Sequence, residues 1–303
     1  MSTAPAIETV GLTKTYAGGV QALADLDLSV RRGEVFGYLG PNGAGKSTTI
    51  RLLLGLIRPT RGRATLFGLD AHEQGVDARR HVGYLPGDLR LSDRLTAREQ
   101  LDSLARLRGS VDEALRTELC ERLQVDLDRP IRQLSKGNRQ KVGIVQAFMH
   151  RPELVVLDEP TAGLDPLLQT EVRALLRETA EQGRTVFISS HSLDEVQHAA
   201  DRVGIIRRGR LVDVDAVESL RERSLRHVTV TFARAPDADA LDRIDGVRVV
   251  GVDGATVRLS CPESSIDALV KRVAEHEVVD LVSQPADLEE IFLELYRQGD
   301  DAG

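Results

Sequence analysis

The chain has 303 residues, of which 41% are hydrophobic, and carries a formal net charge of -7 at pH 7. This length suffices for one large domain and one smaller domain, and the acidic balance argues against a free-standing nucleic-acid binder, which usually has a basic excess. Cys120 and Cys261 form no metal-ligand motif, which favours a reducing compartment. The N-terminal segment lacks a signal-peptide pattern, and no apolar run approaches the ~20 residues that span a bilayer. We therefore expect any membrane role to require a partner.

The first two segments with a clear pattern are residues 7–16 and 22–30, which alternate apolar and polar side chains. Such alternation is typical of half-buried strands, so these segments predict a β edge. Tyr16 lies at the end of the first strand, where its ring could stack on a nucleotide base. Its position alone equally favours a packing role.

Residues 40–48, GPNGAGKST, match G-x-x-x-x-G-K-[ST] and follow VFGYL, an apolar run typical of a strand. Glycines in such a loop allow several peptide N–H groups to converge on one anion, and the helix that follows directs its positive end at the same point. Lys46 adds a charge, and the Ser47 hydroxyl suits Mg²⁺. The predicted phosphate-binding residues are Gly40, Pro41, Asn42, Gly43, Ala44, Gly45, Lys46, Ser47 and Thr48.

Two short strands, RATLFG and HVGYLP, are expected after this helix, followed by a helical segment over about residues 88–150. Thr96 and Glu99 form a capping box that opens a helix through Leu107. A second helix follows over residues 111–123, and residues 134–150 predict a polar turn that leads into an amphipathic helix. This segment interrupts the α/β pattern, so we interpret it as an inserted helical subdomain.

Residues 154–160, LVVLDEP, predict a buried parallel strand that ends in Asp158 and Glu159. Ligands bind at this edge of an open α/β sheet, so Asp158 would reach Mg²⁺ and Glu159 would polarise a water molecule. Without the phosphate loop, the two acids would as readily be a helix cap or a turn. TVFISSH is a further strand that ends at His191. A lone histidine there is more often structural, but its place at the same sheet edge favours contact with a γ-phosphate.

The phosphate loop, LSKGN at 134–138, LVVLDEP, GLDP at 163–166 and His191 together resemble the ordered motifs of ATP-binding-cassette (ABC) ATPases over about residues 5–215. The resemblance implies that Tyr16 stacks on adenine, that Glu159 is the general base and that His191 senses the γ-phosphate. It also implies that Asp165 makes a contact across a dimer, and that Ser135 and Gly137 cap the ATP bound by a second subunit. The implied cofactors are ATP and Mg²⁺, with Ser47 and Asp158 as metal ligands.

The chain departs from the family pattern at two motifs. Gly87 stands where the family usually has a glutamine that touches Mg²⁺ and the attacking water, and we hypothesise that Asp88 supplies an oxygen ligand in its place. The signature is LSKGN where LSGGQ is commoner, so Lys136 adds charge beside Gly137. This variant is similar to that of drug, antibiotic and polysaccharide exporters, which favours export.

Residues 216–303 are expected to form a separate, small α+β domain with the order β-α-β-β-α-β and a closing helix over residues 287–296. The closing helix repeats apolar residues at Leu288, Ile291, Phe292 and Leu295, a stripe more typical of core than of a docking surface. Similar C-terminal units follow the cassette in daunorubicin-resistance ATPases, where they serve dimerisation or regulation. The basic stretches at 207–210 and 221–223 predict a turn and a solvated helix face.

The sequence thus predicts an α/β fold: a P-loop NTPase core of ABC type over residues 1–215, with an antiparallel β edge and a helical insert, and a C-terminal α+β domain. The expected function is the ATP-binding and ATP-hydrolysing motor of an exporter of drugs, antibiotics or other hydrophobic compounds. We expect it to work as a homodimer with a separate integral membrane permease and not with nucleic acid. We expect it at the cytoplasmic face of a bacterial membrane. The alternatives are a soluble ABC-type ATPase and a low-turnover nucleotide-binding regulatory subunit.

Overall fold

The computed structural model describes residues 4–109, 111–223 and 225–284, and the chain divides into two compact units, Met1–Asp215 and Ala216–Gly303. The closing helix expected over residues 287–296, with Leu288, Ile291, Phe292 and Leu295, lies outside the described residues. Each unit has its own hydrophobic core. The two units are therefore described separately.

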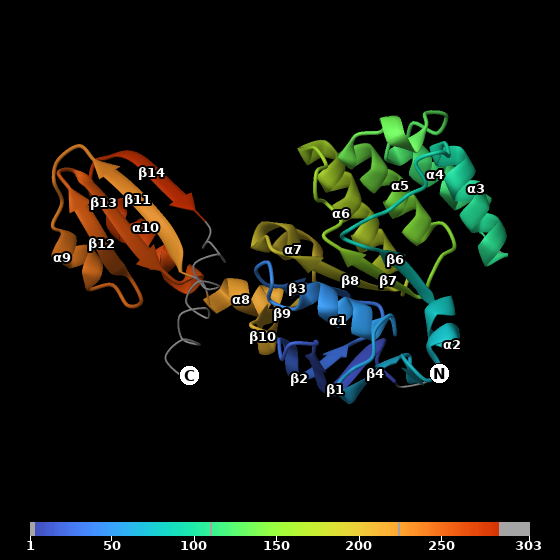
Figure 1. Cartoon of the computed structure of the whole chain (residues 1–303). Helices are drawn as coiled ribbons and strands as arrows, with labels where there is room; N and C mark the ends of the chain where they lie inside the picture. The colour runs from blue at the N-terminus through green and yellow to red at the C-terminus, as the bar shows by residue number, and fades with distance from the viewer. Residues whose placement is uncertain (1–3, 110, 224, 285–303) are drawn as a thin grey trace. The chain divides into compact units, whose positions relative to one another are not determined.

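An antiparallel sheet with the strand order β2-β1-β4-β5 forms one side of the first unit (Figure 1). Its strands are β1 (Ile7–Thr15), β2 (Gln21–Val30), β4 (Arg61–Leu66) and β5 (Leu69–Asp70). Along β2 the side chains alternate between buried and exposed, as the sequence predicts for a half-buried strand. The predicted β edge is confirmed, with β4 and β5 added to it.

The central sheet has the strand order β10-β9-β3-β8-β7-β6, and the pairs β9-β3, β3-β8, β8-β7 and β7-β6 are parallel. The strands are β3 (Val35–Leu39), β6 (Val82–Leu85), β7 (Leu154–Asp158), β8 (Thr185–Ser190), β9 (Arg202–Arg207) and β10 (Arg210–Ala216). Every residue of β3, β7 and β8 is buried. Phe36, Leu154 and Phe187 from these strands share a hydrophobic core with the antiparallel sheet, and helices contact the same strands. Parallel pairing places the carboxyl ends of these three strands at one edge, where the candidate site lies.

Four helices accompany this sheet; three of them follow its strands in the chain, and the second of the four lies between β5 and β6. They are α1 (Lys46–Leu53), α2 (Gly75–Arg80), α6 (Pro166–Glu181) and α7 (Leu193–Ala199). The helix α6 begins after Asp165, whose side chain accepts a hydrogen bond from the Leu168 N–H, and Pro166 occupies its first turn. Both features favour a helix start at this point.

The helical insert joins β6 to β7, two neighbouring strands of the central sheet. It contains α3 (Ala97–Arg108), α4 (Glu113–Arg122), a short 3₁₀ turn (Ile131–Gln133) and α5 (Lys136–Phe148), and Figure 1 shows these helices gathered at one end of the unit. The predicted capping box is confirmed, since Thr96 Oγ1 accepts from the Glu99 N–H while the Glu99 carboxylate accepts from the Thr96 N–H. Because β6 and β7 are paired, both ends of the insert are anchored in adjacent strands of the central sheet.

The second unit contains a four-stranded antiparallel sheet with the order β12-β13-β11-β14. In chain order its elements are α8 (Val217–Arg223), β11 (Arg226–Phe232), α9 (Ala238–Asp242), β12 (Arg248–Asp253), β13 (Thr256–Cys261), α10 (Ile266–Val273) and β14 (Val278–Gln284). The core combines Val228, Val230 and Leu259 from the strands with Leu241 and Leu269 from α9 and α10. The order β-α-β-β-α-β expected from the sequence is therefore observed.

Both cysteines are free and buried, and burial raises the pKa of each thiol. Cys120 lies on α4 and Cys261 ends β13, so each belongs to a different unit. Among the described helices, none combines the length and the apolar character that crossing a bilayer requires.

Candidate active site

The phosphate loop joins the end of β3 to the first turn of α1, and two of its glycines have backbone conformations that favour glycine. Gly43 has φ = +80° and Gly45 has φ = +113°. A Cβ atom on Gly45 would lie 2.7 Å from the Ala22 carbonyl oxygen, and one on Gly40 would lie 2.4 Å from that of Ile206. Only glycine fits these positions without a shift of the backbone. The loop and neighbouring residues line a hollow of about 180 Å³ that extends to Glu159.

Lys46 is buried, and its ammonium lies inside the loop. The Nζ atom donates to the carbonyl oxygens of Gly40 over 2.6 Å and of Pro41 over 3.2 Å, and it lies 3.7 Å from Glu159 Oε1. Burial lowers the pKa of Lys46, while the carboxylates of Glu159 and Asp158 oppose this shift. An anion in the hollow would stabilise the charged form of this side chain further.

Asp158 ends β7 and is 5% exposed. Its Oδ2 accepts a hydrogen bond from the Ser47 hydroxyl over 2.8 Å, and its Oδ1 accepts one from the Ser189 hydroxyl. A hydroxyl and a carboxylate placed together are hard oxygen donors, which fit Mg²⁺. Ser47 and Asp158, predicted separately from two motifs, therefore meet at one point.

Glu159 lies beside His191, and the distance from its Oε1 to His191 Nδ1 is 3.2 Å. The backbone of Glu159 has φ = +52°, a left-handed conformation that is unusual for a residue with a side chain. Behind these two residues, the Glu195 carboxylate accepts from the Thr161 hydroxyl over 2.5 Å and from the Ser190 hydroxyl over 2.6 Å. Glu195 thus ties the segment after β7 to the end of β8.

Tyr16 follows β1 and lies against the first turn of α1. Its hydroxyl is 3.3 Å from Thr48 Oγ1, and the Lys14 ammonium lies 5.3 Å from its ring centroid. The residue is 37% exposed. The structure therefore places Tyr16 next to the phosphate loop, although 32 residues separate it from Thr48 in the chain.

Ser135, Gly137 and Asp165 occupy a different place. Ser135 caps α5 by accepting a hydrogen bond from the Asn138 N–H over 3.2 Å. A Cβ on Gly137 would lie 2.6 Å from the Gly163 carbonyl oxygen, so this turn packs closely on the segment that leads to Asp165. The described lining of the phosphate hollow includes none of these three residues.

Gly87 lies close to Asp158, whereas Asp88 pairs with Arg90. A Cβ on Gly87 would lie 3.1 Å from Asp158 Oδ2. Asp88 instead pairs with Arg90 over 3.0 Å, and its side chain is 74% exposed. It lines a separate hollow of about 320 Å³ together with Lys136 and Gln140. The contacts of Asp88 give no support to its hypothesised role as a metal ligand.

Three residues that build the site were not found from the sequence: Ser189, Glu195 and Gln140. The Ser189 hydroxyl holds Asp158. The Glu195 carboxylate holds the segments around Glu159 and His191. The Gln140 amide holds the backbone of Glu159. Their only sequence signal was proximity to a motif, which does not reveal the direction of a side chain.

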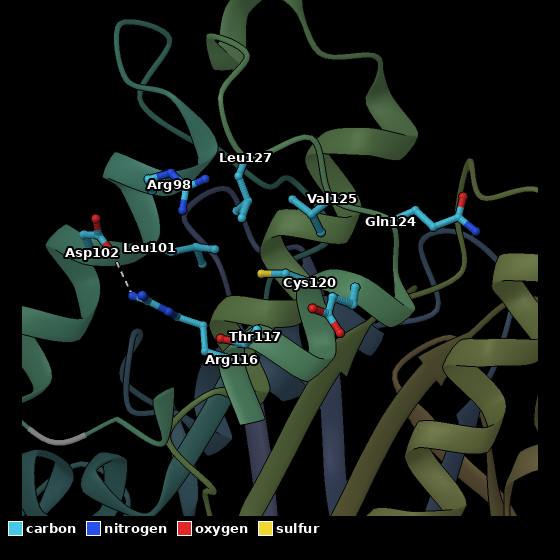
Figure 2. A pocket seen from close by; sticks show the side chains of 10 residues that line it. Arg98, Leu101, Asp102, Arg116, Thr117, Cys120, Gln124, Val125 and Leu127 are labelled. Atoms are coloured by element: carbon cyan, nitrogen blue, oxygen red, sulfur yellow. Dashed lines mark hydrogen bonds and ion pairs between the residues drawn. The ribbon is translucent and has the colours of Figure 1, made fainter. Parts of the chain in front are cut away.

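A further pocket of about 330 Å³ lies between α3 and α4 and the turn that follows α4 (Figure 2). Leu101, Val125 and Leu127 give it an apolar wall, and the Arg116–Asp102 ion pair spans 2.7 Å at its side. None of the predicted site residues lines this pocket. The candidate active site is therefore the hollow at the phosphate loop.

Comparison with known proteins agrees with this geometry. The family model described as "ABC transporter" matches residues 23–162. The bacitracin transport ATP-binding protein BcrA of Bacillus licheniformis is 39% identical over 228 residues, which cover 73% of each chain. The daunorubicin/doxorubicin resistance ATP-binding protein DrrA of Streptomyces peucetius is 33% identical over an alignment of 315 positions. This alignment covers 97% of this chain and 94% of that protein.

Solved structures show the same fold. The ATP-binding subunit of an ABC transporter shares 32% identity at a TM-score of 0.65, over 71% of this chain and 91% of that one. A bacterial ABC transporter cassette solved as a dimer aligns at a TM-score of 0.64 with 23% identity, over 70% of this chain and 98% of that one. The predicted fold class is confirmed. With the phosphate loop, Asp158 and Glu159 gathered in one site and with these relatives, the chain belongs to the ABC transporter family and is an ATPase.

Proposed function

We propose that two copies of this chain bind two ATP molecules between them and that hydrolysis drives export of a drug or antibiotic through a separate membrane permease. The observation that carries this proposal is the division of the site. The phosphate hollow gathers Lys46, Ser47 and Glu159, whereas Ser135 lies outside it. A second copy would supply the missing side.

Nucleotide binding follows from the phosphate loop. Peptide N–H groups of the loop and the start of α1 bind the phosphates, and Lys46 exchanges its loop carbonyls for phosphate oxygens. The Tyr16 ring stacks on adenine. Ser47 and Asp158 hold Mg²⁺, which when bound neutralises phosphate charge.

Hydrolysis requires a base and a group that stabilises the transferred phosphoryl. Glu159 removes a proton from water as the water oxygen bonds to the γ-phosphorus, and the bond to the β–γ bridging oxygen breaks to give ADP and phosphate. His191, 3.2 Å from Glu159, donates a hydrogen bond to a γ-phosphate oxygen. The contact between the two side chains supports their action at one phosphate.

The proposed partners follow from the relatives and from the shape of the site. In the dimer, the Ser135 hydroxyl and the Gly137 N–H of one copy close over the ATP of the other, and Asp165 contacts the opposite subunit. The names of the relatives, bacitracin transport and daunorubicin/doxorubicin resistance, support export of such compounds. The permease supplies the path, so we place this chain at the cytoplasmic face of the membrane. We assign Ala216–Gly303 to dimer contacts or regulation.

The test is the variant Glu159→Gln with Glu153→Gln as the matched control, because Glu153 is an exposed acid paired with His81. We expect Glu159→Gln to lower ATP turnover by about two to four orders of magnitude and to trap an ATP-bound dimer in light scattering. The control should hydrolyse ATP as the parent does. A variant that stays monomeric with ATP, both free and in its membrane assembly, would contradict the proposal.

Two further outcomes separate the alternatives. Gentle solubilisation and mass spectrometry should identify an integral membrane permease in stoichiometric association with this chain. ATP-driven dimers without a permease would favour a soluble ABC-type ATPase. Absence of turnover even with the permease would favour a regulatory subunit.

A further inference from the structure

The backbone of Glu159 needs support that its own sequence does not supply. Its φ of +52° lies in the left-handed region, where the Cβ atom crowds the backbone. Residues adopt such conformations at functional sites when the surrounding structure holds them there. The direction of the Glu159 carboxylate therefore depends on whatever fixes the peptide groups on either side.

Gln140 makes contact with these peptide groups from α5. The side chain is 6% exposed, and its Nε2 donates to the carbonyl oxygen of Glu159 over 3.1 Å and to that of Pro160 over 3.0 Å. Carbonyl oxygens only accept hydrogen bonds, so the NH₂ end of the amide must face them, and its two hydrogens serve the two carbonyls. One buried side chain thus holds two consecutive peptide groups.

Two backbone hydrogen bonds also hold Glu159, but neither of them fixes the Pro160 carbonyl, which the Gln140 amide contacts. The Glu159 N–H donates to the Ser189 carbonyl over 3.1 Å, which fixes the entry into the turn. On the exit side, the Glu159 carbonyl also accepts from the Ala162 N–H, over 3.3 Å. The contact from Gln140 is shorter, and it extends to Pro160.

The same helix packs on the turn at a second point. A Cβ on Gly137 would lie 2.6 Å from the Gly163 carbonyl oxygen, so the first turn of α5 has no room to move toward residues 159–163. The amide of Gln140, one turn further along α5, is therefore presented from a fixed position. This geometry suits a side chain that positions a neighbour.

We propose that Gln140 is a positioning residue for the reaction: its amide holds the Glu159–Pro160 peptide groups and so directs the Glu159 carboxylate at the attacking water. The inference rests on the proposed role of Glu159 as the general base. Gln140 itself contacts neither the nucleotide nor the attacking water. Its effect on the rate must pass through Glu159.

The variant Gln140→Leu removes the amide donors and retains the size of the side chain. We expect kcat to fall by about tenfold to a hundredfold, since a small misplacement of a catalytic group has an effect of this order, while KM for ATP stays within about twofold. The matched control is Gln169→Leu, because the Gln169 amide donates to the Leu164 carbonyl over 3.1 Å, further along the same segment. The control should retain the parental kcat.

A double-mutant cycle separates positioning from general support of the fold. In the Glu159→Gln background, Gln140→Leu should change the residual turnover by less than about twofold, because the carboxylate that it positions is already absent. Gln140→Glu, which replaces the donors by a carboxylate, is a second variant in case leucine disturbs the packing, and it should lower kcat likewise.

Three results would overturn the inference. An unchanged kcat in Gln140→Leu and Gln140→Glu excludes a positioning role. Equal losses in both backgrounds, or a rise in KM together with a lower melting temperature, would make Gln140 a structural residue only. If Glu159→Gln itself leaves turnover intact, the assignment of the base fails and this inference fails with it, whereas loss in Glu159→Gln alone leaves the proposed function standing.

Discussion

The Ser47 hydroxyl donates a hydrogen bond to Asp158 Oδ2 over 2.8 Å, and this contact joins the first turn of α1 to the end of β7 across 111 positions of the chain. The distance shows that two motifs, each recognisable alone, converge on one point. Both groups are oxygen donors, so the contact defines where a hard cation would bind.

Asp158→Asn retains the shape of the side chain and removes its charge. We expect the Mg²⁺ concentration that half-activates hydrolysis to rise by more than about a hundredfold, and Ser189→Ala, which removes the hydrogen bond to Asp158 Oδ1, to raise it by about tenfold. The measurement is ATP turnover against free Mg²⁺ for the three proteins. The same half-activating concentration in Asp158→Asn and the parent would exclude Asp158 as a ligand.

Gly87→Ala and Asp88→Ala form a matched pair at neighbouring positions. A methyl group at position 87 would lie 3.1 Å from Asp158 Oδ2, so we expect weaker activation by Mg²⁺. Asp88 pairs with Arg90, and we expect its loss to change turnover by less than about threefold, as for an exposed ion pair. Both variants are assayed over the same Mg²⁺ range. A sharp loss in Asp88→Ala would restore its hypothesised role as a ligand.

Tyr16→Ala removes a ring, and Tyr16→Phe removes only the hydroxyl that lies 3.3 Å from Thr48 Oγ1. Stacking on a base contributes about 1–3 kcal/mol, so we expect the alanine variant to bind ATP about tenfold more weakly or worse. The phenylalanine variant should stay within about threefold of the parent, the size of one hydrogen bond. Titration calorimetry measures both. Equal affinity in the parent and Tyr16→Ala would favour the packing role.

His150→Gln tests a half-buried histidine outside the site. Burial, assisted by the charge of Arg108, lowers the pKa of His150 from 6.5 to about 4. Between these two pH values the unfolded chain binds a proton that the folded chain does not, so stability is lost as the pH falls from 6.5 toward 4. The ring is half-buried, and with solvent screening we expect a loss of about 1–2 kcal/mol.

Glutamine stays neutral over this range, so the melting temperature of His150→Gln should fall less steeply with acid than that of the parent. Identical slopes for the parent and His150→Gln would exclude this linkage.

Much of the fold was predictable because its signals are local. The phosphate loop, the capping box at Thr96 and the buried strand that ends at Asp158 each depend on residues close together in the chain. Helix α6 and the pair β9 and β10 were not predicted, although the turn at 207–210 between those two strands was. The short apolar run of β9 fits either a helix or a strand, and its pairing with β3 decides the outcome.

The site was predictable as a set of residues but not as a geometry. Sequence motifs indicated Glu159 and His191, yet the left-handed backbone of Glu159 depends on contacts from β8 and α5. For the same reason no sequence motif indicates that Gln140 and Glu195 hold the segments around the base. The short distance between position 87 and Asp158 also arises only when β6 and β7 pair.

The two buried thiols have a practical consequence for the experiments above. A thiol whose pKa is raised is protonated at neutral pH, and the thiolate is the form that reacts with maleimides. Cys120 and Cys261 should therefore remain unlabelled under mild conditions, and a single exposed cysteine introduced beside Ser135 would carry a fluorophore at one defined place. Energy transfer from that probe would follow the approach of a second copy in real time, in a protein that keeps both of its native cysteines.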